Sequence, residues 1–170
     1  LRRKTERVRV MKSFNDLLEI HKRLDELFLD HQRWLLRLGL KEAAAALDVY
    51  MIELFAHMQD EEEWMVPMYR ERAEVPVGGA AEIFLGEHDK MRQYLLLFKE
   101  ELTKMAEAED LERAVLFLLD SQHIFKRLLV HHDTRERKML YPLLDDVTTE
   151  QEREGLFTKL KASPFMMVQT

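Results

Sequence analysis

Two segments of the chain repeat one pattern of residues that can do chemistry. The pattern is a histidine, a glutamate four positions later and a proline six positions after that: His57, Glu61 and Pro67, then His132, Glu136 and Pro142. On an α-helix, residues four apart project from one face, roughly 6 Å from each other. A single pair of this kind is commoner as an exposed ion pair. Two copies with proline at the same offset favour a metal site.

The elements that must position these pairs are helices. Turn residues at Gly39, 75–79, 109–110 and 145–149 divide the chain into four long amphipathic segments and a short final one, with almost no strand signal. Ser13 with Asp16 is a plausible cap for the first helix. The pattern predicts an all-α fold, an antiparallel up-down-up-down four-helix bundle with a short C-terminal helix.

The same punctuation predicts the domain organisation. Residues 1–12 are expected to be a basic N-terminal arm, residues 13–145 the bundle, and residues 146–170 a short helix and tail. The arm is interpreted as solvated, or packed along the bundle, rather than as a nucleic-acid-binding patch. Because the chain begins with Leu1, preceding residues or a fused domain are left open.

Six polar residues fall on the apolar stripes that should face the bundle core: His21, His57, Glu61, His88, His132 and Glu136. A buried imidazole or carboxylate costs several kcal/mol unless it finds a partner. Counting about 1.5 Å per residue along alternating helices places His21, His57 and His88 at one height and His132 about a turn lower. We therefore predict that these six side chains bind metal in one slab of the interior.

Composition excludes several other functions. The chain has 170 residues, 46% hydrophobic and 34% charged, which fits one domain with a sizeable core. A net charge of −6 argues against nucleic acid, and no apolar run could span a membrane or act as a signal peptide. There is no cysteine for disulfides or thiolate ligands. No phosphate-binding glycine loop or catalytic Ser/His/Asp grouping competes. A cytoplasmic location is expected.

In combination, these residues resemble the hemerythrin-like, HHE cation-binding family. The first and third helices each carry a histidine, and the second and fourth each carry the His-x3-Glu motif followed by proline. The resemblance covers residues 13–145 and implies a non-haem centre of two iron ions with an oxo or hydroxo bridge. It also implies that His21, His57, His88 and His132 are nitrogen ligands and that Glu61 and Glu136 bridge the metals.

Two departures separate the chain from the oxygen carriers of this family. Arg92 stands where carriers have a second histidine on the third helix, and Arg137 where they have an aspartate on the fourth. Fewer protein ligands leave more open metal positions, which favours reactivity over reversible carriage. The resemblance is therefore closer to divergent bacterial members, which are associated with oxygen, nitric oxide, peroxide or iron handling. Arg92 is expected to point outward or to pair with Glu136.

Several neighbouring residues have open roles. Asp60 and Glu62 could substitute as ligands or accept hydrogen bonds from them, and Asp25 and Glu87 could orient a ligating imidazole. His31, His123 and His131 are not expected to be ligands. Pro67 and Pro142 either terminate their helices or kink them around the metals. Five aromatic and methionine side chains are interpreted as core packing more readily than as the lining of a ligand pocket: Tyr50, Trp64, Met65, Met91 and Tyr141.

The favoured function is a di-iron protein that binds O2, NO or peroxide for sensing, storage or iron handling. The alternatives are an enzyme that turns over peroxide, O2 or NO at the same metals, and a metal-free helical interaction scaffold. A binding protein is favoured over a dedicated enzyme. The residue types would also accept manganese or zinc, and a homodimer or a signalling domain as partner or fusion is left open.

Overall fold

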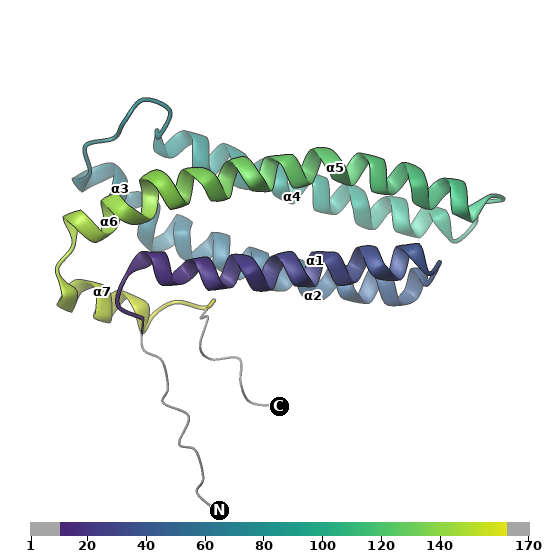
Figure 1. Ribbon diagram of the computed structural model, residues 1–170, viewed down its shortest axis with the longest axis horizontal. Helices are drawn as coiled ribbons and strands as arrows, with labels where there is room; N and C mark the ends of the chain where they lie inside the picture. Colours follow the sequence, from purple (N-terminus) through teal and green to yellow (C-terminus); the bar gives the residue numbers. More distant parts are fainter. Residues whose placement is uncertain (1–10, 163–170) are drawn as a thin grey trace, which may run out of the picture.

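The computed structural model describes residues 11–162, and its described residues form helices and no strand. Four long helical segments run side by side along the molecule, and a short helix crosses one end (Figure 1). Their bounds are α1 Leu18–Leu36 after a 3-10 turn Phe14–Leu17, then α2 Leu40–Asp60 with α3 Val66–Arg72, α4 Ala81–Met105, α5 Leu111–Arg135 with α6 Tyr141–Val147, and α7 Glu150–Phe157. The predicted all-α bundle is confirmed.

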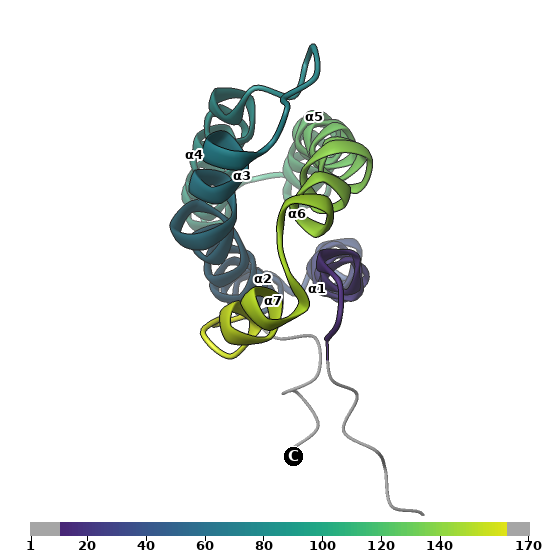
Figure 2. The same cartoon turned by 90° about the vertical axis from the view of Figure 1, so that its left-hand side faces the viewer.

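The four segments form a closed square seen end on. Figure 2 shows α1 beside α2, α2 beside α4, α4 beside α5, and α5 beside α1. Because successive segments run in opposite directions and are joined by short turns, the topology is antiparallel up-down-up-down. The predicted N-terminal arm lies almost wholly outside the described residues. No described helix is long and apolar enough to cross a membrane.

Local signals explain where the helices begin and end. The hydroxyl of Ser13 and the carboxylate of Asp16 form a reciprocal capping box at the first turn, as the sequence indicated. Asp110 caps α5 through the backbone N–H of Arg113. At the turn between α1 and α2 the left-handed residue is Leu38, with φ of 58°, directly before Gly39. These caps fix where the helices begin along the bundle axis and therefore the heights of the residues that they carry.

The core divides along its length into an apolar half and a polar layer. Aromatic rings fill the apolar half, where Phe28 packs against Tyr50 with ring centroids 5.0 Å apart and against Phe125 at 5.2 Å. The polar layer lies nearer the end covered by α6 and α7 and contains buried histidines and glutamates. Packed aromatic side chains hold the four helices at a fixed separation, so the polar layer is pre-formed rather than collapsed.

The two prolines neither terminate their helices nor leave them regular. Each follows a single wide π turn, Glu61–Met65 before Pro67 and Glu136–Leu140 before Pro142, and the helix then continues as α3 or α6. In each turn the carbonyl of the glutamate accepts from an N–H five residues later. A proline lacks an N–H and clashes with the carbonyl four residues earlier, and a widened turn accommodates both effects. Each glutamate of the repeated motif thus begins a π turn.

Candidate metal centre

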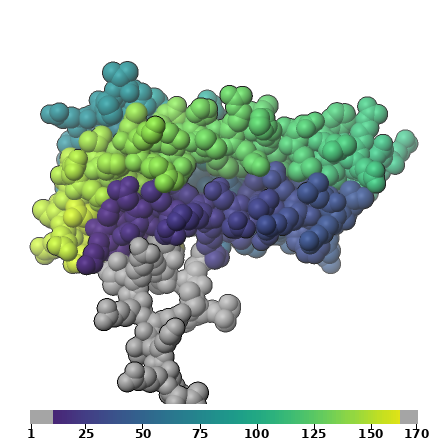
Figure 3. Space-filling view, viewed as in Figure 1, coloured from purple at the N-terminus to yellow at the C-terminus, as the bar shows by residue number. Residues whose placement is uncertain are grey.

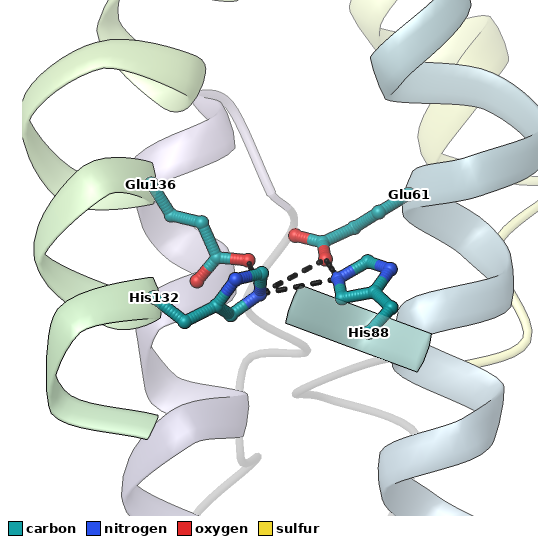
Figure 4. Close-up of side chains that lie close together, drawn as sticks. All are labelled: Glu61, His88, His132 and Glu136. Atoms are coloured by element: carbon teal, nitrogen blue, oxygen red, sulfur yellow. Dashed lines mark hydrogen bonds and ion pairs between the residues drawn. The ribbon is translucent and has the colours of Figure 1, made fainter. Parts of the chain in front are cut away.

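All four long segments contribute to one cluster of side chains. His21 comes from α1 and His88 from α4, while each of the other two segments supplies a histidine and, one turn later, a glutamate: His57 with Glu61 and His132 with Glu136. Figure 4 shows four of these side chains pointing toward one another. Their ligand atoms form two groups, Glu61, His88, His132 and Glu136 in one, and His21, His57 and Glu136 in the other. All except His21 are buried.

The four imidazoles meet in two pairs. The Nε2 atoms of His21 and His57 are 3.0 Å apart, and those of His88 and His132 are 3.1 Å apart. Two imidazole nitrogens that bind one cation at about 2.1 Å, at a right angle, lie about 3.0 Å from each other. Each pair therefore has the spacing of two nitrogen ligands on a single cation.

Each glutamate extends one oxygen toward each histidine pair. For Glu136, Oε1 lies 2.8 Å from His132 Nε2 and Oε2 lies 3.3 Å from His21 Nε2. For Glu61, Oε2 lies 3.2 Å from His88 Nε2 and Oε1 lies 3.6 Å from His57 Nε2. A carboxylate with its two oxygens divided between two cation positions is a bridging ligand.

Three of these four carboxylate oxygens are deeply buried and make no acceptable hydrogen bond to the described residues: Glu61 Oε2, Glu136 Oε1 and Glu136 Oε2. A buried carboxylate oxygen without a hydrogen bond costs at least 1–3 kcal/mol, about the range for an unsatisfied polar group. Coordination to a cation would satisfy all three oxygens at once. The donor set thus fits cation binding on grounds of burial as well as distance.

Three imidazoles are held from behind by carboxylates. Their Nδ1 atoms donate to an acidic oxygen on a neighbouring turn or helix: His21 to Asp133 at 2.6 Å, His88 to Glu62 at 2.8 Å and His132 to Glu87 at 2.9 Å. A hydrogen bond of this kind keeps a proton on Nδ1 and turns Nε2 toward the centre, where a bound cation would take the place of an Nε2 proton. The Nδ1 atom of His57, in contrast, has no hydrogen-bond partner in the described structure.

An arginine reaches the outer side of each orienting carboxylate. Arg92 donates to Glu62 at 2.7 Å, Arg137 donates to Asp133 at 3.1 Å, and Arg135 pairs with Glu87. Arg92 is therefore paired with Glu62 and not with Glu136, the acid that the sequence suggested. The guanidinium groups fix the carboxylates and offset part of their charge near the cluster.

Burial and mutual charge perturb the titration of the cluster. Burial lowers the pKa of His57 to about 3. Burial also opposes protonation of His132, but the carboxylates of Glu136 and Glu87 outweigh it and raise its pKa to about 10. Burial, reinforced by the charge of Glu61, raises the pKa of Glu136. Positive charge from protonated imidazoles is what balances the two glutamates here, and cations would do the same.

Tyr141 contributes a hydroxyl that the sequence did not single out for chemistry. Its hydroxyl donates to Glu61 Oε1 at 2.7 Å and lies 3.3 Å from His21 Nε2. Burial, together with Glu136 and Glu61, raises the pKa of the phenol, which therefore keeps its proton. The available signal was its place one turn after Glu136, within the second repeated motif.

The remaining residues with open roles have structural positions. His31 binds the carbonyl of Ala43 at 2.8 Å and Gln122 at 2.8 Å, whereas His123 and His131 are exposed. Asp60 accepts the backbone N–H groups of Lys161 and Ala162. Among the described residues Asp25 makes no hydrogen bond to any of the four imidazoles, so its predicted orienting role is wrong, and Asp133 has that role for His21.

Met65 is core packing and Trp64 is partly buried against Lys159. The ligand roles of His21, His57, Glu61, His88, His132 and Glu136 stay a prediction, although the structure brings all six side chains together.

No curated protein and no solved structure matches the chain. A family model described as the hemerythrin HHE cation binding domain matches residues 13–144. Because that match covers most of its length, the chain belongs to the hemerythrin HHE cation-binding family.

Proposed function

We propose that the six clustered residues bind two iron ions and that this non-haem di-iron centre binds O2 or a related small ligand, NO or peroxide. The observation that carries the proposal is the pairing of the four imidazoles with two glutamates that each turn one oxygen to each pair. The cation-binding description of the family supports metal binding. Iron, the number of ions and the small ligand are the parts that we add.

The protein would hold each ion with two imidazoles and share both carboxylates between them. His21 and His57 would bind one ion and His88 and His132 the other, with Glu61 and Glu136 as bridges. When bound, the two irons would supply Lewis acidity and one-electron redox chemistry toward O2, NO or peroxide. Four protein donors to a six-coordinate ion leave about two positions for other ligands.

The surrounding residues prepare the site for that role. The carboxylates of Asp133, Glu62 and Glu87 hold the Nδ1 protons of three imidazoles, so that Nε2 faces the ions. Tyr141 holds its hydroxyl proton on Glu61 Oε1, next to the centre.

Metal analysis tests the proposal. Protein purified without a metal-affinity tag should contain two irons per chain, and His132→Ala should lose most of that metal because it removes one ligand of a pair. His123→Ala is the matched control, since His123 is exposed on the same helix and should leave the metal content unchanged. Protein without bound metal, or full metal content in His132→Ala, would instead favour the scaffold.

An enzyme that turns over peroxide, O2 or NO is the second candidate, favoured by the phenol of Tyr141 beside the cluster, which could deliver a proton. The visible spectrum of the reduced protein on admission of air separates the two functions. A reversible change supports ligand binding. Irreversible bleaching with catalytic loss of added peroxide supports an enzyme.

A further inference from the structure

A groove of about 430 Å³ leads from the surface between α1 and α5 to the cluster. Figure 3 shows this face, with α1 in purple to blue and α5 in green on either side of the hollow. His21, His57, His132 and Glu136 form the inner end of the groove, whereas Glu61 and His88 do not line it. The groove therefore reaches the centre from the side of the His21 and His57 pair.

The groove is too large to serve a diatomic ligand alone. A water molecule takes up about 30 Å³ of liquid, and an apolar cavity of about 150 Å³ holds one benzene. Pockets for organic ligands begin at about 300 Å³. A volume of 430 Å³ therefore has room for a molecule of two fused rings.

The walls are apolar and partly aromatic. Phe28 on α1 and Tyr50 on α2 present rings to the groove, and Met58 and Met91 line the side nearer the cluster. Aromatic rings pack favourably against other rings, and methionine sulfur packs well against ring edges. These walls suit an aromatic ring system.

One polar group inside the groove lacks a partner. Tyr50 is only 1% exposed and lines the groove, and its hydroxyl makes no hydrogen bond to any other residue between 11 and 162. Because the hydroxyl is not fully enclosed, it is open to the groove and available to a polar atom of a ligand there. A hydroxyl on the ligand could both donate and accept.

The rim of the groove carries charges of both signs. Asp25 and Asp133 stand against Lys22, Lys126 and Arg137, of which Lys22 is already paired with Glu19 and Arg137 with Asp133. Neither sign dominates, so the rim offers no advantage to an anion or a cation. A neutral ligand fits the rim, the walls and the polar group together.

We propose that this groove binds a neutral aromatic alcohol of about two rings, with its hydroxyl on Tyr50 and its rings against Phe28, Met58 and Met91, beside the candidate metal centre. This proposal deepens the proposed function. It rests on that function at the inner end of the groove, because candidate metal ligands form that end. The groove itself is formed by the described side chains and can be tested apart from the metals.

The test is titration of the full chain with 1-naphthol, followed by calorimetry or by the fluorescence of the probe. One saturable site per chain with a dissociation constant below about 1 mM is expected. Tyr50→Phe should weaken binding roughly three- to tenfold, because it removes one hydrogen bond and leaves the ring. Tyr94→Phe is the matched control: Tyr94 is partly buried on α4, does not line the groove, and should leave binding unchanged.

Leu129→Trp should weaken binding more than tenfold, because an indole on this wall would fill the groove. Circular dichroism and the melting temperature show whether this variant folds, and Tyr50→Phe tests the proposal if it does not. Absence of saturable binding, equal binding by Tyr50→Phe, or tighter binding of decanoate than of 1-naphthol would overturn the assignment. Metal content is measured on the same samples, so failure of the di-iron proposal is visible separately from failure here.

Discussion

At the residue scale, the orientation of the imidazoles depends on carboxylates that do not themselves face the centre. Glu62 directly follows Glu61 in the chain, yet it turns away and accepts from His88 Nδ1 while Arg92 donates to it from outside. Two adjacent glutamates thus make different contacts, since Glu61 faces the cluster and Glu62 accepts from a histidine. Glu63, the third in the run, is exposed and reaches only Lys161.

We predict that Glu62→Gln lowers metal affinity by roughly 10- to 100-fold, the usual effect of removing an outer partner of a ligating histidine. The amide accepts a weaker hydrogen bond than the carboxylate, so His88 is less firmly held in the tautomer that presents Nε2. Competition with a chelator of known affinity measures the change. Glu63→Gln is the control and should match the wild-type protein. Equal affinities in all three proteins would show that Glu62 does not orient His88.

The sequence revealed some of these partners and concealed others. Glu87 was a candidate for orienting an imidazole, and it accepts from His132 on the neighbouring helix. Asp133 was missed because its partner is His21, 112 positions away, and no local spacing reports that contact. Asp25, one turn after His21, was the local choice and proved wrong. Partners across a bundle depend on the rotation of two helices, which periodicity alone defines too coarsely.

At the element scale, the π turns show how a helix can carry both a candidate metal ligand and a packed end. Each wide turn begins at Glu61 or Glu136 and absorbs one residue before the helix resumes at Val66 or Tyr141. Proline at a constant offset indicated a disturbance of the helix, and the sequence allowed termination or a kink. It could not distinguish these from a π turn, because all three relieve the same missing N–H.

His31 links three helices and gives the bundle a pH dependence. On α1, it binds the carbonyl of Ala43 on α2 and the side chain of Gln122 on α5. Burial lowers its pKa in the folded protein. The unfolded chain therefore binds more protons just below pH 6.5, roughly the free value, so this contribution to stability is present above that pH and is lost as the pH falls.

We predict that the free energy of unfolding falls more steeply in wild type than in His31→Gln when the pH is lowered from about 7.5 to about 5.5, by at most about 1.4 kcal/mol per pH unit. Urea unfolding of both proteins at the two pH values measures the difference. Other groups that titrate in this range are common to both proteins and cancel. Parallel pH profiles would mean that His31 is not held neutral.

Asp60 provides a second link between elements. It lies at the end of α2, next to Glu61, but its carboxylate accepts the backbone N–H groups of Lys161 and Ala162 at 2.9 and 2.7 Å. The residue that the sequence offered as an alternative ligand therefore fastens the C-terminal segment to the bundle. A role of Asp60 as a metal ligand and a role in fastening the C-terminal segment predict different results when Asp60 is substituted.

We predict that Asp60→Ala destabilises the protein by about 2–3 kcal/mol, since it removes two charge-assisted hydrogen bonds, and leaves the metal content unchanged. The melting temperature should fall by roughly 4–12 °C. Asp48→Ala is the control, because Asp48 is on the same helix and makes only a surface pair with Lys99; its effect should stay within about 0.5 kcal/mol. Loss of metal from Asp60→Ala with little change in stability would assign it to the centre.

At the scale of the whole molecule, four helices carry their polar residues to one height. The sequence allowed this prediction because each helix rises by a constant amount per residue and the turns between helices are short. His132 was expected about a turn below the others, yet its Nε2 lies 3.1 Å from His88 Nε2. Helix boundaries inferred from turn residues are uncertain by a few positions, enough to account for a turn of error.

Counting the rise per residue along the helices could not predict the groove. Tyr50 and Met91 were interpreted as core packing more readily than as a pocket lining, and both line the space between α1 and α5. Whether two helices leave a groove depends on side-chain volumes along the whole contact, so it appears only when all four helices are packed. A stripe of apolar residues identifies the inner face of a helix but not whether that face is completely covered.

The stability of the whole bundle should depend on metal, because ions that bind only the folded state shift the unfolding equilibrium. At a free metal concentration about 100 times the dissociation constant, binding adds about 2.7 kcal/mol, which corresponds to a rise in melting temperature of roughly 5–10 °C for a chain of this size. Glu136 turns an oxygen to each histidine pair, so Glu136→Gln weakens both cation positions at once. We predict that this variant loses most of the metal-dependent rise, whereas Glu82→Gln, a change at an exposed pair with Arg70, retains it. Calorimetry of the three proteins with Fe²⁺ under anaerobic conditions and with excess chelator measures the effect. A full rise in Glu136→Gln would place the cations elsewhere, since a carboxylate shared by both positions cannot be dispensable to each.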